Sequence, residues 1–519
     1  MYIEPRTNVK ILHNVPLDDT YDHTLYFANT TDQYNYFANL TKKNCVNYTY
    51  QRVNKGRLRI EGKADNYYDC NYMMFQNTSF GNKWFYAFIK SVEYINNETT
   101  EIEFEIDVIQ TWLFDCQVEE CFIERQHSLS DAIGDNIVPE PVDCGEYVFN
   151  NYEPVTLMNE MCICVAIVDV SGQAQGQLYD GIYGGAKLFV YSSSDVSGVN
   201  NKIDEYIQQP DAILGIYMFP KILIGSIPVD HIMPYGASAG KNIILKNAIT
   251  KNDTLDGYLP KNGKMYTYPY NYFHVDNASG SDLALRYEFF ENLQPVVEIS
   301  GTITQPVNLT LRPASYKGMS PYSQLGGYTT LNTEVIELSS YPICSWNVDS
   351  YEAWVAQNSI PLGGRILTSA LTSGLSSALN PIVGGINIAS NIANISNALT
   401  QWYQASIQAD MCKGNFNNGG VNTAIGKQQF YSGRRSVCYQ YAKIIDDFFN
   451  MYGYAHKCVG RLNTHSRPHW NYVKTIGCVL TGSVPADDTK KIASIYDRGI
   501  TFWRYGNEVG NYELDNRPS

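Results

Sequence analysis

A long stretch without charged side chains constrains this chain more than any other feature. No Asp, Glu, Lys, Arg or His occurs between Arg365 and Asp410, although the chain of 519 residues has a formal net charge of -14. Apolar residues recur every three or four positions on both sides of a turn marked by Pro381 and Gly384-Gly385. This spacing predicts two amphipathic helices joined by an apolar tip. The apolar residues of this predicted helical hairpin are Leu367, Leu371, Leu375, Leu379, Ile382, Val383, Ile386, Ile388, Ile392, Ile395, Leu399 and Trp402.

Three interpretations compete for this uncharged segment. A permanent transmembrane helix needs about 20 mostly apolar residues, and Ser, Thr and Asn interrupt every turn here, so a stable anchor is disfavoured. A second interpretation is a buried hairpin in the core of a globular domain. The third is a membrane-active loop that is packed away in one state and inserts in another, because charge is expensive in a bilayer whereas Ser and Thr can bond to their own helix. The sequence leaves the second and third open.

The remainder of the chain has the composition of a β-rich protein with several domains. Its length suggests two to four domains, and the 41 Tyr residues favour strands while the frequent Asn and Gly favour turns. An acidic chain lacks the clustered Lys and Arg that clamp nucleic-acid phosphates. Like charge also keeps a polyanion from adsorbing to a wall. The charge balance therefore argues against a nucleic-acid clamp and is compatible with a DNA conduit.

The clearest local pattern is a β-hairpin within residues 84–109. The runs "WFYAFIKSVEYI" and "TEIEFEIDVI" flank the turn-like "NNETT". In the second run apolar and acidic residues alternate, which indicates a strand with one buried and one solvated face. The alternating apolar residues are Ile102, Phe104, Ile106 and Val108. Up to about Glu124 the pattern is strand-like throughout.

The middle of the chain alternates between strand-like runs and turns. The polar residues 125–147 predict a linker, and residues 193–209 predict a helix after a Ser/Asp start. Apolar runs bounded by turn residues predict strands. These strands fall at residues 160–170, 185–193, 212–229, 242–249 and 293–313.

The end of the chain predicts two helices and two closing strands. "SVCYQYAKIIDDFFNMYGYA" has apolar residues at helical spacing before Gly453, so we expect an amphipathic helix that ends there. Its predicted apolar face comprises Tyr441, Ile444, Ile445, Phe448, Phe449 and Tyr452. Residues 487–499 predict a second helix, between strands in 471–484 and 499–506.

No motif predicts an enzyme, a cofactor or a metal site. "GASAG" matches G-x-S-x-G around Ser238, but the nucleophile elbow requires a strand before the serine and a helix after it, and the flanking residues favour a loop. The pairs Glu119-Glu120 and Asp446-Asp447 are adjacent carboxylates of the kind found on solvated faces rather than in glycosidases. We therefore expect no catalytic residues.

The cysteines and basic residues give no stronger signal. The twelve cysteines form no C-x-x-C pair, and Cys162 and Cys164 lie in the apolar run "MCICVAIVDV", so buried, reduced thiols are expected and zinc is not. "GGVNTAIGKQ" lacks the Ser or Thr that a phosphate-binding loop places after the lysine, here Lys427. "GRRS" at 433–436 and "GRLNTHSRPHW" at 460–470 form the most basic region, which suits contact with DNA or a neighbouring subunit. The start of the chain lacks a basic region followed by an apolar core, so no secretory signal is expected.

Several blocks resemble one protein family. They are "TDQYNYFANL" (31–40), "YMMFQNTSFGNKWFYAFIKSVEYINNETTEIEFEIDVIQTWLFD" (72–115), "YGYAHK" (452–457), "NYVKT" (471–475) and "DRGITFW...GNYELDN" (497–516). In order and spacing they are similar to the tail knob proteins of small short-tailed phages of the phi29 type. The uncharged segment occupies the place of that family's long hydrophobic loop, although its sequence differs and it is shorter.

The resemblance implies a structural virion protein at the distal end of the tail. It implies a homohexamer that joins an upstream tail or collar protein, with β-rich domains lining a channel for double-stranded DNA. The hydrophobic loops would plug this channel and later insert into the host cytoplasmic membrane. The alternatives are a tail-associated cell-wall hydrolase and a receptor-binding tail protein.

The resemblance and the sequence pattern together predict the domain organisation. The fold class is mainly β (α+β), with tail-tube-like domains in a ring and a long hydrophobic helical hairpin. We expect a tube domain at 1–125 and one or more β-rich domains at 126–345. The membrane-active loop would take 346–425, and a C-terminal part at 426–519 would pack with the tube domain.

Overall fold

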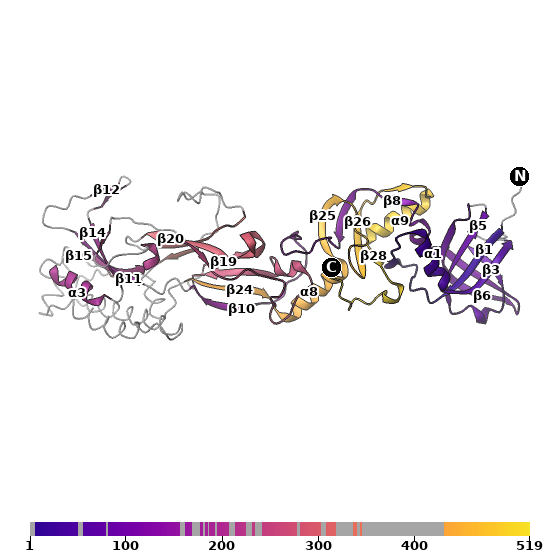
Figure 1. Ribbon diagram of the computed structural model, residues 1–519, viewed down its shortest axis with the longest axis horizontal. Helices are drawn as coiled ribbons and strands as arrows, with labels where there is room; N and C mark the ends of the chain where they lie inside the picture. The colour runs from indigo at the N-terminus through magenta and orange to yellow at the C-terminus, as the bar shows by residue number, and fades with distance from the viewer. Residues whose placement is uncertain are drawn as a thin grey trace, which may run out of the picture. The chain divides into compact units, whose positions relative to one another are not determined.

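The computed structural model confirms a mainly β fold with more than one domain (Figure 1). Its described residues form two compact units, which are considered separately below. Unit 1 comprises the described residues of 1–146, 257–266 and 438–519, and unit 2 those of 147–256 and 267–437. The structure describes residues 6–49, 56–78, 81–155, 161–168, 177–179, 182–184, 186–192, 195–206, 213–224, 231–233, 241–277, 281–302, 308–317, 336–339, 343–344 and 430–518.

The first sheet of unit 1 is antiparallel and contains the predicted hairpin. Its strand order is β3-β1-β5-β6-β7-β4. The strands are β1 (Arg6–His13), β3 (Thr41–Thr49), β4 (Arg57–Glu61), β5 (Cys70–Asn77), β6 (Trp84–Asn96) and β7 (Thr99–Ile106). Strands β6 and β7 pair directly, and the Asn96 side chain accepts a hydrogen bond from the Glu98 N–H at 2.9 Å in the turn. The hairpin prediction is confirmed.

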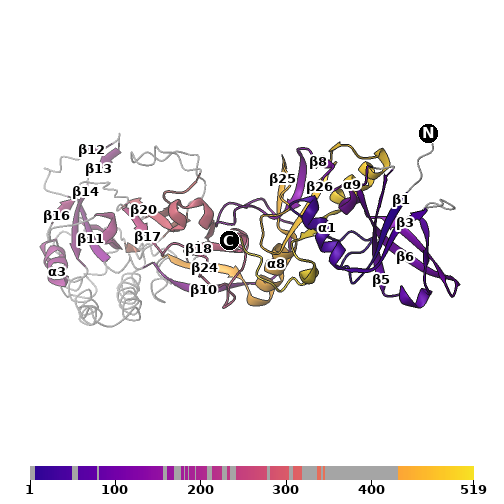
Figure 2. The ribbon, with the colours of Figure 1, turned by 45° about the vertical axis from the view of Figure 1, so that its right-hand side comes forward.

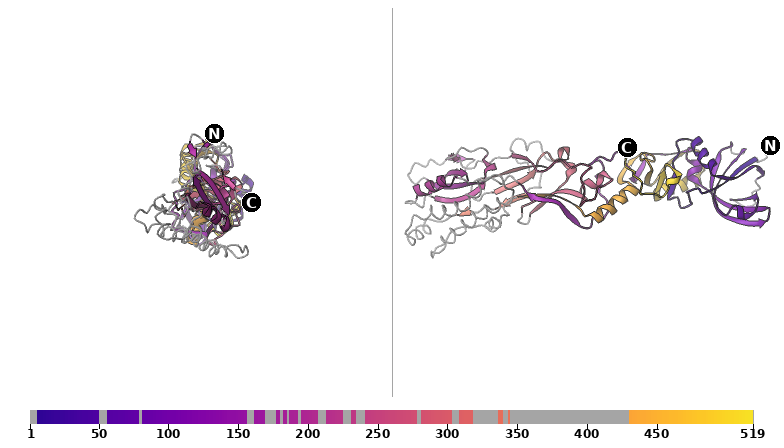
Figure 3. Two further views of the ribbon diagram at one scale, coloured as in Figure 1. Left: turned by 90° about the vertical axis from the view of Figure 1, so that its left-hand side faces the viewer. Right: turned by 60° about the horizontal axis from the view of Figure 1, so that its bottom comes forward.

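The second sheet of unit 1 combines strands from both ends of the chain, and its order is β2-β28-β26-β9-β25. Its strands are β2 (His23–Leu25), β9 (Cys121–Gln126), β25 (Tyr454–Gly460), β26 (Trp470–Ile476) and β28 (Ile500–Trp503). β2 and β28 are parallel, whereas the other pairs are antiparallel. The right view of Figure 3 shows the yellow C-terminal elements beside the indigo N-terminal ones. A short pair, β8 (Cys116–Val118) and β27 (Leu480–Gly482), also joins the two ends.

The two N-terminal helices of unit 1 correct the prediction of strands throughout this part. Helix α1 (Thr30–Asn39) starts where the Asn29 side chain accepts a hydrogen bond from the Asp32 N–H, a favourable N-cap. Helix α2 (Val108–Trp112) starts at Asp107, whose carboxylate accepts hydrogen bonds from the N–H groups of Ile109 and Gln110 at 3.1 Å. The alternation that suggested a strand through Val108 therefore ends at Ile106.

Both predicted C-terminal helices are confirmed. Helix α8 (Tyr439–Tyr452) ends at Gly453 with φ +65°, and α9 (Ala486–Arg498) ends at Gly499 with φ +104°, conformations that glycine adopts without strain. The buried residues of α8 are Ala442, Ile445, Asp446, Phe449 and Asn450.

The predicted apolar face of α8 is partly wrong. Tyr441 is 36% exposed and Ile444 is 66% exposed. The apolar residues of α8 span a wider arc of the helix than the arc that is buried against the core. The buried arc also includes the carboxylate of Asp446.

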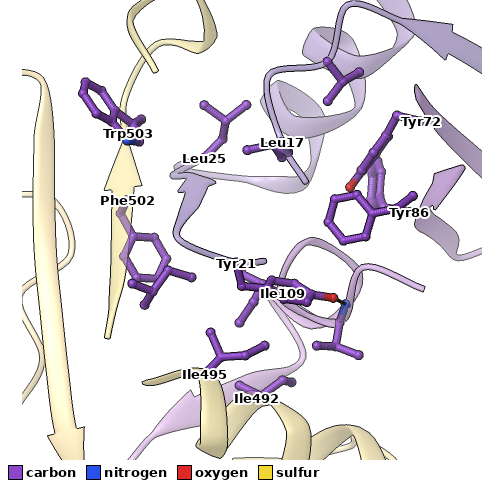
Figure 4. Packing of buried hydrophobic residues seen from close by; sticks show 14 of the residues in the cluster. Leu17, Tyr21, Leu25, Tyr72, Tyr86, Ile109, Ile492, Ile495, Phe502 and Trp503 are labelled. Carbon is purple, nitrogen blue, oxygen red and sulfur yellow. Dashed lines mark hydrogen bonds between the residues drawn. The ribbon is translucent and has the colours of Figure 1, made fainter. Parts of the chain in front are cut away.

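A single apolar core joins the two sheets of unit 1 (Figure 4). Phe502 and Trp503 on β28 lie near Leu25 on β2, and Ile492 and Ile495 on α9 approach the same cluster. Other members of the cluster come from the first sheet and α2: Tyr72, Tyr86, Phe88, Val108 and Ile109. The opposite side of the first sheet carries a second buried cluster made by its own strands, which includes Val9, Ile11, Met73 and Ile102. Since both clusters are buried, the first sheet is held on two sides.

Unit 2 is built of antiparallel sheets and confirms the predicted middle strands in part, since the strands expected at 212–229 and 242–249 end at Pro220 and Ile244. The orders are β10-β24-β18-β19, β16-β14-β11-β15-β23, β17-β20-β21-β22 and β12-β13. Figure 2 shows β10, β24 and β18 side by side. The elements are β10 (Tyr147–Pro154), β11 (Met161–Val168), β12 (Gln177–Tyr179), β13 (Ile182–Gly184), β14 (Ala186–Ser192), α3 (Val196–Glu205), β15 (Ile213–Pro220), β16 (His231–Met233), β17 (Lys241–Ile244), β18 (Asn271–Asp276), β19 (Asp282–Leu285), β20 (Val296–Thr302), β21 (Asn308–Pro313), β22 (Ile336–Ser339), β23 (Ile343–Cys344) and β24 (Tyr431–Val437).

Strand β11 is the central strand of its sheet, and its two cysteines are buried as predicted. Residues 162–167 are all buried, including Cys162 and Cys164. A strand with neighbours on both sides and both faces covered has no solvated face, so its side chains do not alternate. Helix α3 packs on β11 and β14 with Val199 and Ile203 buried.

Candidate functional site

The predicted membrane-active residues lie outside the described residues. This holds for all twelve, from Leu367 to Trp402, and also for Ser238 and Lys427. Their roles remain predictions. Within the described residues, no helix combines the length and the apolar character needed to cross a bilayer.

The first sheet of unit 1 carries a surface on which several charged side chains pair with one another. We define this charged sheet face as Arg57, Arg59, Glu93, Glu101 and Glu103. Strand register places these residues together, because β4 pairs with β7 and β7 with β6. Arg59 donates to Glu101 at 2.8 Å, and Arg57 donates to Glu101 at 3.0 Å and lies 3.7 Å from both Glu93 and Glu103.

Both arginines of the charged sheet face are paired with glutamates. Hydrogen bonds from Arg59 and then Arg57 hold the pKa of Glu101 below its usual value. Glu93 lies directly opposite Glu101 in the β6–β7 register, a like-charge pair that the two arginines offset. Three carboxylates against two guanidinium groups give this face a net negative charge. Such a face does not retain a polyanion.

The two carboxylate pairs have structural environments, and one of them corrects the prediction of solvated charges. Glu119 accepts a hydrogen bond from Thr481 at 2.6 Å, and Glu120 lies 3.5 Å from Arg461 on the surface. Asp446, by contrast, is fully buried. Its side chain is therefore an internal anchor.

Asp446 fixes residues 257–266 to α8. It accepts hydrogen bonds from the Tyr258 hydroxyl at 2.9 Å, from the N–H groups of Lys261 and Asn262 at 2.7 and 3.1 Å, and from the Asn262 side chain at 2.8 Å. Burial raises the pKa of Asp446, and these hydrogen bonds oppose that rise. Sequence alone did not reveal the anchor, because its partners are about 185 residues away in the chain.

The predicted linker is irregular but packed, and it carries a buried polar network. The Glu140 side chain is buried and accepts from Lys264 at 2.8 Å and from the Ala455 N–H at 2.7 Å, and it also pairs with Arg125. Asp131 accepts from the Gly263 N–H at 3.0 Å and from the Tyr454 hydroxyl. Polar residues without periodicity resemble a loop in the sequence, and only the fold shows that they face inward.

The basic residues do not form one patch. On β24, Arg434 lies 3.3 Å from Asp253, and Arg435 stacks near Tyr147 and Phe149. In unit 1, Arg461 is exposed, whereas Arg467 is buried and donates to the Asn516 carbonyl at 3.4 Å. The predicted basic region is therefore distributed over both units.

The described cysteines and acidic residues give no sign of redox or metal chemistry. No disulfide joins the cysteines in the described ranges, and Cys45, Cys70 and Cys121 are buried like Cys162 and Cys164. Within the same ranges, no three His, Cys, Asp or Glu side chains gather closely enough to hold a metal ion.

Comparison with protein families identifies the chain. Residues 237–517 match the family described as "Bacillus phage phi29, Tail knob protein gp9, C-terminal domain". The chain belongs to the phi29 gp9 tail knob family. Residues 5–117, which include the first sheet of unit 1, match a second family described as "Caudoviral major tail protein N-terminus".

Individual relatives of this tail knob family span nearly the whole chain. The tail knob protein gp9 of Bacillus phage PZA is 27% identical, and that of Bacillus phage phi29 is 25% identical, each with 98% of both chains covered. Among solved structures, the tail knob protein gp12 of bacteriophage C1 superposes with a TM-score of 0.60 at 12% identity, covering 98% of this chain and 99% of that one. This last likeness shows a shared fold.

Membership of the tail knob family establishes the coarse function. The chain is a structural component of a phage tail and thus of the virion. It is not an enzyme, because these relatives are structural tail proteins. The prediction of no enzyme is confirmed, and the hydrolase alternative loses its support.

Proposed function

We propose that this tail knob protein forms the distal tube of the tail and that DNA leaves the capsid through it. Copies of the chain, six in our proposal, close into a ring that joins an upstream tail or collar protein. The observation that carries this proposal is the double family match, in which a major tail protein domain at 5–117 precedes a tail knob domain at 237–517.

Charge supports the conduit. The chain has 38 Lys and Arg against 52 Asp and Glu, and the arginines of the charged sheet face are tied to carboxylates. Nucleic-acid binding depends on basic groups that displace counterions from phosphates. A tube with this balance allows double-stranded DNA to slide without being held.

The uncharged segment supports a role at the host membrane. Single helices of this polarity are poor anchors, but apolar faces from several subunits can cover one another around an axis and so avoid water. Once released, the same faces can bury themselves in the lipid interface. In this proposal the segments plug the tube before infection and enter the host cytoplasmic membrane during genome delivery.

Two variants of the full chain test the membrane role. Leu371→Asp and Ile392→Asp each place a charge on an apolar face, and a charge costs about 3 kcal/mol or more at the centre of a membrane helix. Both variants should assemble as the wild type does and release at least tenfold less dye from anionic liposomes. Tyr505→Asp, on an exposed residue of unit 1, is the matched control. Wild-type dye release by both loop variants would exclude insertion.

Electron microscopy of the purified protein tests the ring. Particles with six-fold symmetry are the expected result. A monomer at all concentrations would contradict the tube.

A further inference from the structure

The second sheet of unit 1 exposes an apolar row across three neighbouring strands. Phe122 on β9 lies opposite Val459 on β25 and opposite Ile476 on β26. The three side chains are 36%, 68% and 55% exposed. Val479 is also exposed and lies close by, since its carbonyl accepts a hydrogen bond from the Glu119 N–H. Contiguous exposed apolar side chains of this kind mark interaction surfaces.

The apolar row lies on a face of the second sheet that α8 covers near Tyr472 but not near Ile476. Along β26, Tyr472, Lys474 and Ile476 alternate onto one face of the sheet. Tyr472 contacts Tyr452 of α8, with ring centroids 5.1 Å apart. Four residues further along the strand, Ile476 is exposed. Helix α8 therefore covers the face near Tyr472 and leaves it bare at the row.

The edge strand of this sheet is poorly suited to pairing with a strand from a partner. β25 is the edge strand, and its register with β9 shifts between Ala455 and Cys458, where Lys457 has φ +48°. Bulges and lysines at an edge discourage a further strand from adding. A partner must therefore contact the side chains on the face.

The charges around the row indicate which partner fits. On one side Glu124 pairs with Lys474 at 2.9 Å, and on the other Glu120 lies 3.5 Å from Arg461. Exposed Glu119 and exposed Lys457, close to Phe122 and Val459 in the chain, add one charge of each sign. These charges sum to zero around the row, whereas the whole chain carries -14. DNA and acidic partners favour a basic rim, and basic partners favour an acidic one. A neutral rim around an apolar centre is where two copies of one acidic chain approach each other with the least repulsion.

We propose that the apolar row is one half of the contact between neighbouring copies of this chain, an inference that rests on the proposed ring. In a closed ring each contact joins two different faces of the subunit. The row is one of these faces, and the next copy supplies the other from elsewhere on its surface. Burial of Phe122, Val459 and Ile476 drives the association.

Charged substitutions in the full chain test this assignment. Phe122→Asp and Ile476→Asp each bury an unpaired charge in the contact. The protein concentration at which half of the chains are assembled should therefore rise at least roughly a hundredfold relative to the wild type. Sedimentation velocity over a dilution series measures this, with thermal unfolding as the check of folding. Val459→Asp is the reserve variant, because an exposed residue on an edge strand tolerates a charge without unfolding. Tyr505→Asp, exposed to 53% and outside the row, is the control.

The outcomes separate this inference from the ring itself. Wild-type and Tyr505→Asp rings with monomeric row variants support the assignment. Rings from all the row variants would overturn it and leave the ring intact, and loss of the ring in Tyr505→Asp as well would also overturn it. A wild type that is monomeric at every concentration would overturn both proposals.

Discussion

The two sheets of unit 1 share a core but differ in where they keep their charges. The first sheet displays its charges in surface pairs on the charged sheet face, while its main buried ionisable group is Asp107 at the end of β7. The second sheet exposes the apolar row and is tied to α8 through buried His127. The first surface suits contact with water, whereas the second suits contact with protein. Four measurements test this contrast between the two sheets.

The largest expected effect is a loss of folding stability at acid pH that is caused by His127. Its Nδ1 accepts from the Tyr472 N–H at 2.8 Å and its Nε2 donates to the Asn450 carbonyl at 3.1 Å, so the buried ring is held neutral. Burial first, and then Arg467 and Arg125, lower its pKa from 6.5 to about 3. As the pH falls below 6.5, His127 is protonated in the unfolded state but stays neutral in the folded state. Stability should therefore decline by about 5 kcal/mol towards pH 3.

His127→Gln isolates this contribution. Denaturant unfolding at a series of pH values should show a flatter acid limb than in the wild type. His465→Gln, at an exposed position, is the control. Equal acid slopes in His127→Gln and the wild type would remove His127 as the cause.

The second prediction tests whether the two sheets of unit 1 unfold together in one cooperative transition. Phe502→Ala removes a buried ring from the shared core and should lower the free energy of unfolding by about 3–5 kcal/mol. Hydrogen exchange should then speed up in both β6 and β26. Tyr505→Ala should stay within about 0.5 kcal/mol of the wild type. Faster exchange in β26 alone would show that the sheets unfold separately.

Asp107 should respond to pH in the opposite sense to His127. Burial raises its pKa to about 6, although the Tyr72 hydroxyl donates to it at 2.8 Å. Because the folded state binds this proton more tightly, stability is greatest below the usual pKa of 3.8 and is lost as the pH rises through 6, by about 3 kcal/mol. Asp107→Asn keeps a capping oxygen and should abolish this dependence, as measured by unfolding between pH 4 and 7. A wild-type dependence in the variant would contradict the assignment.

The smallest effect belongs to the charged sheet face. Arg59→Ala removes an exposed partner of Glu101 and should cost less than about 1 kcal/mol, with the difference vanishing at 1 M salt. The lowered pKa of Glu101 means that this small gain is present above its usual pKa and is lost on acidification. Unfolding of wild type and variant at two salt concentrations measures it. A larger, salt-independent loss would show that the face is part of the core.

The sequence predicted elements whose signal is local. The β6–β7 hairpin follows from alternation, and the ends of α8 and α9 follow from Gly453 and Gly499. It failed where distant segments decide the outcome. Asp446 is polar in any local window, and only the arrival of residues 257–266 explains its burial. The exposed Ile444 has the same cause, because periodicity shows which residues are apolar but not how wide the covering surface is.

The candidate surfaces show the same limit. The charged sheet face was predictable in part, since the glutamates of β7 alternate in the sequence, but their arginine partners come from β4. The apolar row was not predictable. Phe122 lies more than 300 residues before Val459 and Ile476 in the chain, and the three strands that carry them meet only in the folded sheet.

The parallel pairing of β2 with β28 has a consequence for synthesis. The Trp503 indole reaches His23, a partner 480 positions earlier, and β28 separates β2 from the other strands of its sheet. A nascent chain cannot complete this sheet until its last strands leave the ribosome, and closing so long a loop is slow. Products that end before β28 therefore lack the complete second sheet of unit 1. Synthesis must therefore proceed through β28 before β2 can join the other strands of this sheet.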